Sequence, residues 1–198
     1  TPDSVFFKDG KYISKEELTK RQVTHVQTVV ERYKGRLPVW DAVNEAVGDD
    51  NQMRKSHWYN VLGEEFIDTT FHTAHEVDPK AHLMYNDYNN ERPEKRAATI
   101  ELLKRLQKRK VPVHGVGMQA HINVDTDMQL FEDSILEYAK LGLRIDITEL
   151  DIDVLPLVWD LPVAEISTRF EYKPERDPYR DGLSQDMQDK LSRAYESL

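Results

Sequence analysis

Apolar residues recur at helical spacing in several stretches of the chain, and the first of these stretches follows Tyr12. Ser14 and Glu17 have the spacing of a capping box at the start of a helix, and Gly35 is suited to its end. Between these limits the apolar positions fall on one stripe, formed by Leu18, Val23, Val26, Val30 and Tyr33. The pattern predicts an amphipathic helix between Ser14 and Gly35.

Further helices are predicted along the rest of the chain. Their expected ranges are about 56–77, 93–110, 127–141 and 184–195. Pro93 suits the first turn of its helix, and the basic residues at the other end interact favourably with the helix dipole. Gly142 is placed to end the helix that starts near Asp127.

Apolar runs of strand length lie between the predicted helices. They cover residues 38–47, 82–88, 113–121 and 144–152. Strands that alternate with amphipathic helices indicate βαβ units and a parallel sheet, which is an α/β fold. The strands recur every roughly 30 to 45 residues, about the length of one unit of a (β/α)8 TIM barrel.

The chain of 198 residues corresponds to about half of such a barrel. We therefore expect one partial barrel domain over residues 1–198. A parallel sheet left open on both sides would expose backbone donors and acceptors, so we expect the other strands to lie outside this chain. The polar segment from Asp153 to Gly182 predicts a functional loop or a disordered connection, and Trp159 in it is a candidate to flank a cleft.

Charge and composition exclude several classes of protein. The chain has 36 acidic and 27 basic residues, a formal net charge of -9 and no basic stripe, so we expect no nucleic-acid partner. No apolar run approaches the roughly 20 residues that a membrane-spanning helix needs, so we expect no membrane partner. The absence of cysteine excludes disulfides and thiolate metal sites.

The four predicted strands share one feature, since each ends in polar residues. These residues are Asn44-Glu45, Asn86-Asp87-Tyr88, Gln119-Ala120-His121 and Glu149-Leu150-Asp151. In barrels and open α/β sheets, ligands bind at the carboxyl ends of the strands. The pattern therefore predicts that these polar side chains converge on one site.

Two glutamates at strand ends are what the hydrolysis of a glycosidic bond requires. One carboxylic acid protonates the departing oxygen, while the other carboxylate attacks the anomeric carbon or activates water. Glu45 and Glu149 fit this pair, although a single strand-end Glu is more often a solvated surface residue. In a retaining enzyme the two carboxyl groups lie about 5 to 5.5 Å apart, and only one carries a proton.

Other readings of single residues remain open at this point. A lone His near a strand end, such as His121, is more often structural than catalytic, and Tyr88 is about equally suited to stacking on a sugar and to packing in a loop. A metal site is disfavoured, because His72 and His75 have no accompanying carboxylate motif and are expected to be exposed. Trp40 is expected in the core rather than as a platform on which a sugar stacks, and Trp58 suits either of these two roles.

Four motifs in order resemble one enzyme family. They are Val39–Ala46 (VWDAVNEA), Leu83–Asn89 (LMYNDYN), Gly115–Ile122 (GVGMQAHI) and Ile145–Ile152 (IDITELDI). These segments look like strands four to seven of the family ten glycoside hydrolases, which are chiefly retaining endo-β-1,4-xylanases on a TIM barrel. Thr1-Pro-Asp with Phe6-Phe7 is similar to the segment after the third strand, so the resemblance covers nearly the whole chain, and strands one to three and eight are expected elsewhere.

The resemblance implies a role for each residue of the catalytic pair. Glu45 is expected to be the general acid/base and Glu149 the nucleophile, with His121 bridging Glu149 and Asp151 and orienting the nucleophile. We expect Glu45 to carry the proton, because the residues that precede it are apolar.

The resemblance also implies residues that bind the substrate. Asn44 would hydrogen-bond the 2-hydroxyl of the sugar under attack, Gln119 would touch that sugar or the nucleophile, and Tyr88 would lie toward the leaving group. No cofactor and no metal ion is expected.

The sequence thus predicts a retaining endo-1,4-β-xylanase that cleaves internal bonds of xylan or xylo-oligosaccharides. The alternatives are a non-catalytic carbohydrate-binding or scaffold fragment of such an enzyme, and a related barrel glycosidase acting on cellulose or mannan. The other expected partner is the missing barrel segment, either from the same gene product or from a second chain. A secreted or cell-surface location is expected because polymeric xylan cannot enter a cell.

Overall fold

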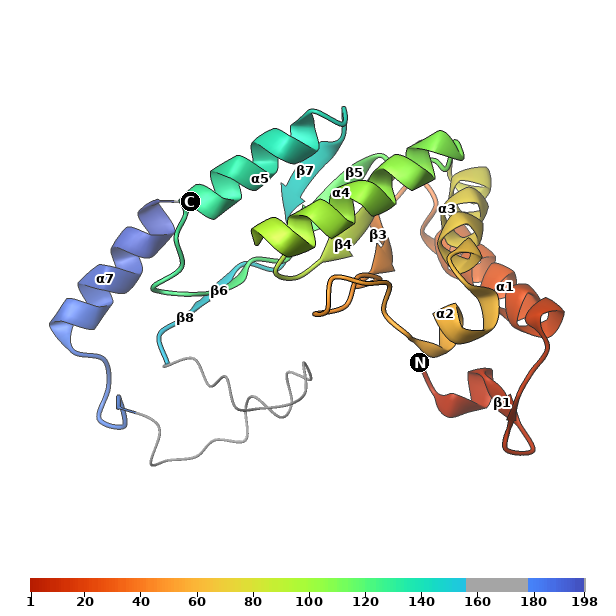
Figure 1. The fold of residues 1–198 in the computed structure, drawn as a ribbon, viewed down its shortest axis with the longest axis horizontal. Helices are drawn as coiled ribbons and strands as arrows, with labels where there is room; N and C mark the ends of the chain where they lie inside the picture. The colour runs from red at the N-terminus through yellow and green to blue at the C-terminus, as the bar shows by residue number, and fades with distance from the viewer. Residues whose placement is uncertain (156–177, 198) are drawn as a thin grey trace.

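The computed structural model describes residues 1–155 and 178–197 (Figure 1). Trp159 and most of the predicted connection between Asp153 and Gly182 lie outside these residues. Within the described part, a curved parallel sheet is flanked by helices, as the alternating pattern predicts.

The main sheet has four parallel strands in the order β3-β4-β5-β7. The strands are β3 (Val39–Asn44), β4 (His82–Asp87), β5 (Gly115–Met118) and β7 (Arg144–Ile147). The connecting helices are α3 (Glu65–Val77), α4 (Pro93–Lys108) and α5 (Gln129–Ala139). Each strand of this sheet therefore pairs with the next strand of the same sheet through a helical crossover, which is the arrangement of a partial (β/α)8 barrel.

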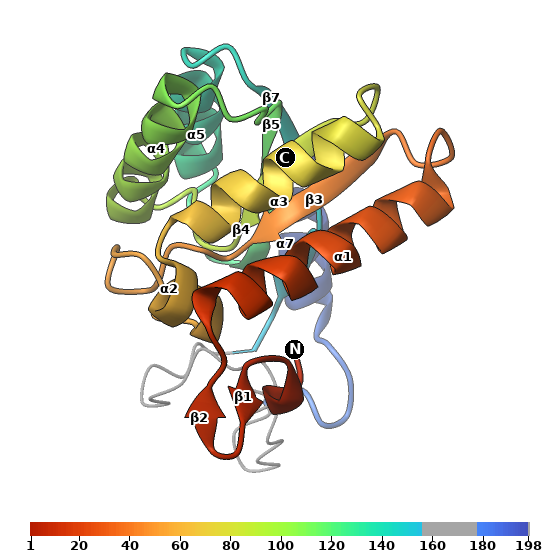
Figure 2. The ribbon, with the colours of Figure 1, turned by 90° about the vertical axis from the view of Figure 1, so that its right-hand side faces the viewer.

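Helix α1 (Lys15–Tyr33) lies along α3 on the outside of the sheet (Figure 2). The hydroxyl oxygen of Ser14 accepts a hydrogen bond from the Glu17 backbone N–H at 3.1 Å, which confirms the predicted N-cap. The Glu17 carboxylate pairs with Arg21 at 2.9 Å instead of returning to the cap, so only half of the capping box forms. A short 3₁₀ turn, Asp3–Val5, and a hairpin of β1 (Phe7–Lys8) and β2 (Lys11–Tyr12) precede the helix.

The prediction of a single helix over residues 56–77 is wrong about the continuity of the helix. The structure has two helices there, α2 (His57–Leu62) and α3, separated at Gly63. Gly63 has a φ of +64°, a left-handed conformation that ends a helix and that glycine adopts without strain. Apolar periodicity continues across this break, so the pattern did not reveal it.

The last two predicted strands are each divided as well. Residues 121–123 form β6 (His121–Asn123) and residues 151–153 form β8 (Asp151–Asp153), and these two pair in parallel as a separate sheet. Ala120 has a φ of +61°, so the chain turns sharply between β5 and β6. The final helix, α7 (Gln185–Glu196), follows the N-cap residue Ser184, close to the start of the predicted helix, and contacts β8.

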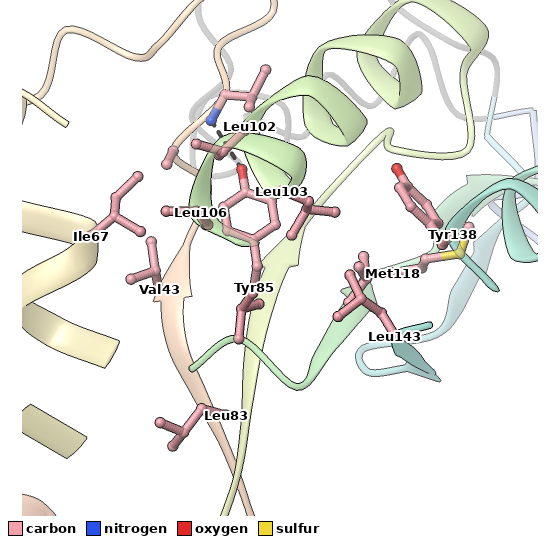
Figure 3. Close-up of a cluster of buried hydrophobic side chains, with 14 of the residues drawn as sticks. Val43, Ile67, Leu83, Tyr85, Leu102, Leu103, Leu106, Met118, Tyr138 and Leu143 are labelled. Atoms are coloured by element: carbon pink, nitrogen blue, oxygen red, sulfur yellow. Dashed lines mark hydrogen bonds between the residues drawn. The ribbon is translucent and has the colours of Figure 1, made fainter. Parts of the chain in front are cut away.

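The main core lies between one face of the sheet and its helices. Leu83 and Tyr85 of β4 and Leu103 of α4 are fully buried in it (Figure 3). The Tyr85 hydroxyl oxygen accepts a hydrogen bond from the Val47 backbone N–H at 3.1 Å, so this buried polar group is satisfied. Trp40 packs against the edge of this core, as predicted.

A second, smaller core joins the N-terminal segment to the rest. It is formed by the buried side chains Phe6, Leu18 and Leu62, with Trp58 packed edge-on against Phe6 at a ring distance of 4.9 Å. Trp58 therefore has the packing role. Among the residues that the structure describes, no helix has the length and apolarity to span a membrane.

Shortening a side chain at the centre of the main core should destabilise the fold. We expect Leu103→Ala to lower the free energy of unfolding by about 2–5 kcal/mol, because Leu103 is fully buried and its loss leaves a cavity. Leu136→Ala on α5 is the matched control, since Leu136 is 55% exposed and should lose less than about 0.5 kcal/mol. Urea denaturation measures both values, and equal losses would contradict this location of the core.

Candidate active site

The carboxyl ends of the strands bring the predicted site residues together. The parallel hydrogen-bond ladder continues past the strands, since the backbone N–H of Glu45 donates to the Asn86 carbonyl oxygen at 2.8 Å and that of Glu149 donates to the Gln119 carbonyl oxygen at 3.1 Å. Continued pairing keeps neighbouring strand ends at the same level. The side chains of Asn44, Glu45 and Glu149 consequently meet at one edge of the sheet.

Three side-chain amides connect the two glutamates. Gln119 Nε2 donates to Glu45 Oε1 and to Asn44 Oδ1, both at 3.1 Å. Asn86 Nδ2 donates to Asn44 Oδ1 at 3.0 Å and to Glu149 Oε1 at 2.8 Å. The Gln119 side chain thus contacts Glu45, and its implied contact with the sugar stays a prediction.

Sequence reasoning placed Asn86 at a strand end but assigned it no role. Its side chain is almost fully buried, and its Oδ1 accepts a hydrogen bond from the Thr148 hydroxyl at 2.7 Å. A Cβ atom at Gly117 would lie 2.2 Å from Asn86 Oδ1, so the amide occupies space that only glycine leaves free. The Gly-Val-Gly of the third predicted strand was the available signal, because glycine inside a strand often marks a close approach.

His121 lies between two carboxylates. Its Nδ1 is 2.7 Å from Asp151 Oδ2 and its Nε2 is 3.1 Å from Glu149 Oε2. His121 and Asp151 are directly opposite in the β6–β8 pair, so the small second sheet determines their contact. The structure thereby places His121 where the resemblance implied.

The surroundings of His121 change its proton affinity. Partial burial lowers the pKa of His121, but the hydrogen bond to Asp151 and the negative charges of Asp151 and Glu149 outweigh this and raise the pKa above its usual 6.5. The imidazole therefore carries a positive charge next to Glu149 over a wider pH range than a free histidine would.

Glu45 has a different environment from the apolar one that the sequence suggested. Its carboxylate is about one-third exposed, and Arg54 Nη2 lies 3.6 Å from its Oε2. Arg54 comes from the loop between β3 and α2 and carries no periodic signal, so sequence reasoning missed it. The expectation of apolar surroundings is therefore wrong, because a tertiary contact brings a guanidinium to this carboxylate.

Tyr88 lies within a cluster of charged groups rather than on an open surface. Its hydroxyl accepts a hydrogen bond from Arg54 Nη2 at 2.9 Å and donates to Asp49 Oδ1 at 2.8 Å. Lys95 Nζ is 3.5 Å from the centre of its ring. Burial and the hydrogen bond to Asp49 raise the pKa of Tyr88 to about 12, so the phenol stays protonated. Its role toward a sugar stays a prediction.

A carboxylate on β3 interacts with Glu149 and with a second carboxylate on β7. Partial burial, followed by the charges of Glu149 and Asp146, raises the pKa of Asp41 on β3. Arg144 pairs with Asp146 at 2.7 Å and balances one of these carboxylates. The carboxylate of Asp41 therefore interacts electrostatically with those of both Glu149 and Asp146.

The histidines of α3 differ from each other in exposure. His72 is exposed, as predicted, but His75 is partly buried with its ring 5.6 Å from that of His114, so the prediction of two exposed histidines is wrong for His75. Across residues 1–155 and 178–197, no three His, Asp or Glu side chains are placed to hold a metal ion.

Comparison with known proteins gives consistent matches. A sequence model of glycosyl hydrolase family 10 matches residues 1–186. An endo-1,4-beta-xylanase A of Xylanibacter ruminicola is 38% identical over 192 residues, which cover 96% of this chain and 52% of the relative. A GH10 endoxylanase retrieved from a sugarcane soil metagenome is 55% identical, with a TM-score of 0.92, and the match covers 100% of this chain and 58% of that one.

A third relative was solved with a sugar bound. Xylanase 10B of Thermotoga petrophila, in complex with xylobiose, is 38% identical with a TM-score of 0.73, and the match covers 80% of this chain and 48% of that one. The chain spans about half or less of the length of the curated relatives it matches.

The raised pKa of His121 predicts a pH-dependent contribution to stability. A folded-state pKa above the unfolded value of 6.5 stabilises the fold fully below 6.5, and this contribution is lost as the pH rises through the folded pKa. We expect the stability lost in His121→Gln, measured by denaturant unfolding from about pH 5 to about pH 9, to shrink as the pH rises. A loss independent of pH would contradict the ionic contacts.

Removing the Asn86 amide should destabilise the edge of the sheet where the strands end at the candidate site. We expect Asn86→Ala to lower the free energy of unfolding by about 1–3 kcal/mol, because the Thr148 hydroxyl and Asn44 Oδ1 lose a buried partner. Asn60→Ala is the control, since Asn60 is exposed and makes one long hydrogen bond of 3.3 Å. Similar losses in the two variants would show that the Asn86 contacts are not formed.

Proposed function

The chain belongs to glycosyl hydrolase family 10, and on this premise we propose that it carries the catalytic carboxylates of a retaining endo-1,4-β-xylanase. The substrate would be xylan, cleaved at internal xylosidic bonds, or shorter xylo-oligosaccharides. The rest of the barrel, as part of the same gene product or as a second chain, would complete the sugar-binding surface. Secretion is part of the proposal, because polymeric xylan cannot enter a cell.

The proposal is based mainly on the network of side-chain amides that joins Glu45 to Glu149. Hydrolysis with retention needs two carboxyl groups held at a fixed separation on either side of one glycosidic bond. Gln119, Asn44 and Asn86 connect these two groups through hydrogen bonds of 2.8 to 3.1 Å. The two glutamates are thus held as one unit, although they are 104 positions apart in the sequence.

In the proposed first step, Glu149 is the nucleophile. One of its oxygens forms a bond to the anomeric carbon while the bond from that carbon to the departing oxygen breaks, and Glu45 gives its proton to that oxygen. Asn86 donates a hydrogen bond to one oxygen of Glu149 and the His121 imidazolium donates to the other, so the attacking carboxylate is held in a fixed orientation. Asp151 holds His121 in orientation from the other side of the ring.

In the proposed second step, water releases the sugar from Glu149. The Glu45 carboxylate takes a proton from the water as its oxygen bonds to the anomeric carbon, and Glu149 leaves as a carboxylate. Both enzyme groups return to their starting protonation states. Glu45 therefore acts first as an acid and then as a base, which requires a carboxyl group that both loses and regains a proton near neutral pH.

Three further residues are proposed to bind the substrate. Asn44 lies against Glu45 through its Nδ2 at 3.2 Å, which supports the proposal that it binds the sugar under attack. Gln119 is held at the same point by its contacts with Asn44 and Glu45. Tyr88 would border the leaving-group side, where its hydroxyl is oriented by Arg54.

Replacement of the nucleophile tests this function. We expect Glu149→Gln to lower kcat on xylan and on an aryl β-xylobioside by at least about 10³-fold, because an amide cannot form the glycosyl-enzyme bond. Glu76→Gln, an exposed residue of α3, is the matched control and should leave kcat unchanged. Assays use the full chain, alone and with the complementary barrel segment.

Three outcomes would contradict the proposal. Unchanged hydrolysis in Glu149→Gln would exclude this residue as the nucleophile. Faster hydrolysis of cellulose or mannan than of xylan would identify a different glycosidase. Absence of hydrolysis with the complementary segment present, together with binding of xylo-oligosaccharides, would identify a non-catalytic binding fragment.

A further inference from the structure

Arg54 contacts Glu45 through both the backbone and the side chain. The backbone N–H of Arg54 donates to the Ala46 carbonyl oxygen at 2.8 Å, and Arg54 Nε donates to the carbonyl oxygen of Glu45 at 2.8 Å. Glu45 has a φ of +55°, a strained conformation for a residue with a side chain. Because Asn86 also accepts from the Glu45 N–H, both backbone polar groups of this strained residue are held in place.

The two oxygens of the Glu45 carboxyl group have different neighbours. Oε1 accepts hydrogen bonds from Asn44 Nδ2 at 3.2 Å and Gln119 Nε2 at 3.1 Å. An oxygen that faces two N–H donors is a poor place for a proton, since an O–H group there would meet two further hydrogens. The transferable proton therefore belongs on Oε2, the oxygen that lies 3.6 Å from Arg54 Nη2.

The guanidinium of Arg54 is itself held firmly. Its Nη2 donates to the Tyr88 hydroxyl at 2.9 Å, and that hydroxyl donates to Asp49. Lys95 lies against the Tyr88 ring and forms a buried ion pair of 2.8 Å with Asp87. Partial burial lowers the pKa of Arg54, but the interaction with Tyr88 and the negative charges of Glu45 and Asp87 outweigh this and raise the pKa, so the guanidinium stays charged.

We propose that Arg54 is a positioning residue for Glu45, which holds its backbone in the left-handed conformation and assists departure of the proton from Oε2. The inference rests on the proposed role of Glu45 as general acid/base. As the proton moves from Oε2 to the departing sugar oxygen, a negative charge develops on the Glu45 carboxylate, and the nearby guanidinium stabilises it. Arg54 touches neither the sugar nor the reacting atoms in this scheme.

Titration of the Glu45 carboxyl group tests the proposal directly. The full chain is labelled with ¹³C at the glutamate side-chain carboxyl carbons, and the Glu45 resonance is identified by its absence in Glu45→Gln. We expect Arg54→Met to raise the titration midpoint of this resonance, because a positive charge 3.6 Å from the carboxylate is removed. Arg54→Lys should restore the midpoint, since it restores the charge.

A matched control separates this effect from the general loss of an arginine. Arg105 pairs with Glu64 at 2.9 Å between α3 and α4, away from the strand ends, so Arg105→Met should leave the Glu45 midpoint unchanged. Arg54→Gln is a second neutral variant, which keeps a donor for the Glu45 carbonyl oxygen and preserves folding if Arg54→Met does not. An unchanged midpoint in the neutral variants, or an equal rise in Arg54→Lys, would overturn the proposal.

Kinetics distinguish this inference from the proposed function. In an active preparation, the alkaline limb of kcat/KM on xylobiosides with poor leaving groups should move to higher pH in Arg54→Met and return in Arg54→Lys. If the unmodified protein does not hydrolyse xylan, the proposed function is contradicted. The inference about Arg54 is still tested in that case, because the carboxyl titration measures the effect of Arg54 without requiring activity. A shifted midpoint with an unshifted alkaline limb would overturn the assignment of Arg54 to proton transfer.

Discussion

The buried amide of Asn86 is the contact on which the geometry of the site depends. It contacts Asn44 at the end of β3 and Glu149 beyond β7, although β5 lies between β4 and β7. This reach is possible because Gly117 in β5 has no side chain, which leaves room for the amide and for Thr148 beneath it. A buried polar group with all these partners satisfied is stable and rigid, whereas a partly satisfied one would destabilise the edge.

Two departures from regular strand geometry orient the groups around this amide. Positive φ angles at Glu45 and Ala120 turn the chain at the ends of β3 and β5, where regular strands would have continued. The turn at Ala120 starts the small β6–β8 sheet, in which His121 stands opposite Asp151. Such strained residues persist when the surrounding contacts hold them, and here they direct side chains toward one edge.

The charges around the two glutamates are distributed unequally. Glu149 faces an imidazole whose pKa is raised by Asp151, while Glu45 faces the guanidinium of Arg54. Arg54 is supported in turn by Tyr88 and by the buried Asp87–Lys95 ion pair beneath that ring. The acid/base candidate and the nucleophile candidate therefore have different charged neighbours, while the side-chain amides of Gln119, Asn44 and Asn86 connect the two carboxylates.

Periodicity, capping residues and strand-end polarity in the sequence determined most of the fold and of the candidate site. They specify the α1 cap at Ser14, the alternation of strands and helices, and the gathering of Glu45, Glu149 and His121 at one edge, because hydrophobic pattern and parallel topology are local signals. Only tertiary structure decided the break at Gly63, the separate β6–β8 sheet, the bridging position of Asn86 and the approach of Arg54 to Glu45. These features depend on positive φ angles and on contacts between residues distant in sequence, which no periodic pattern encodes.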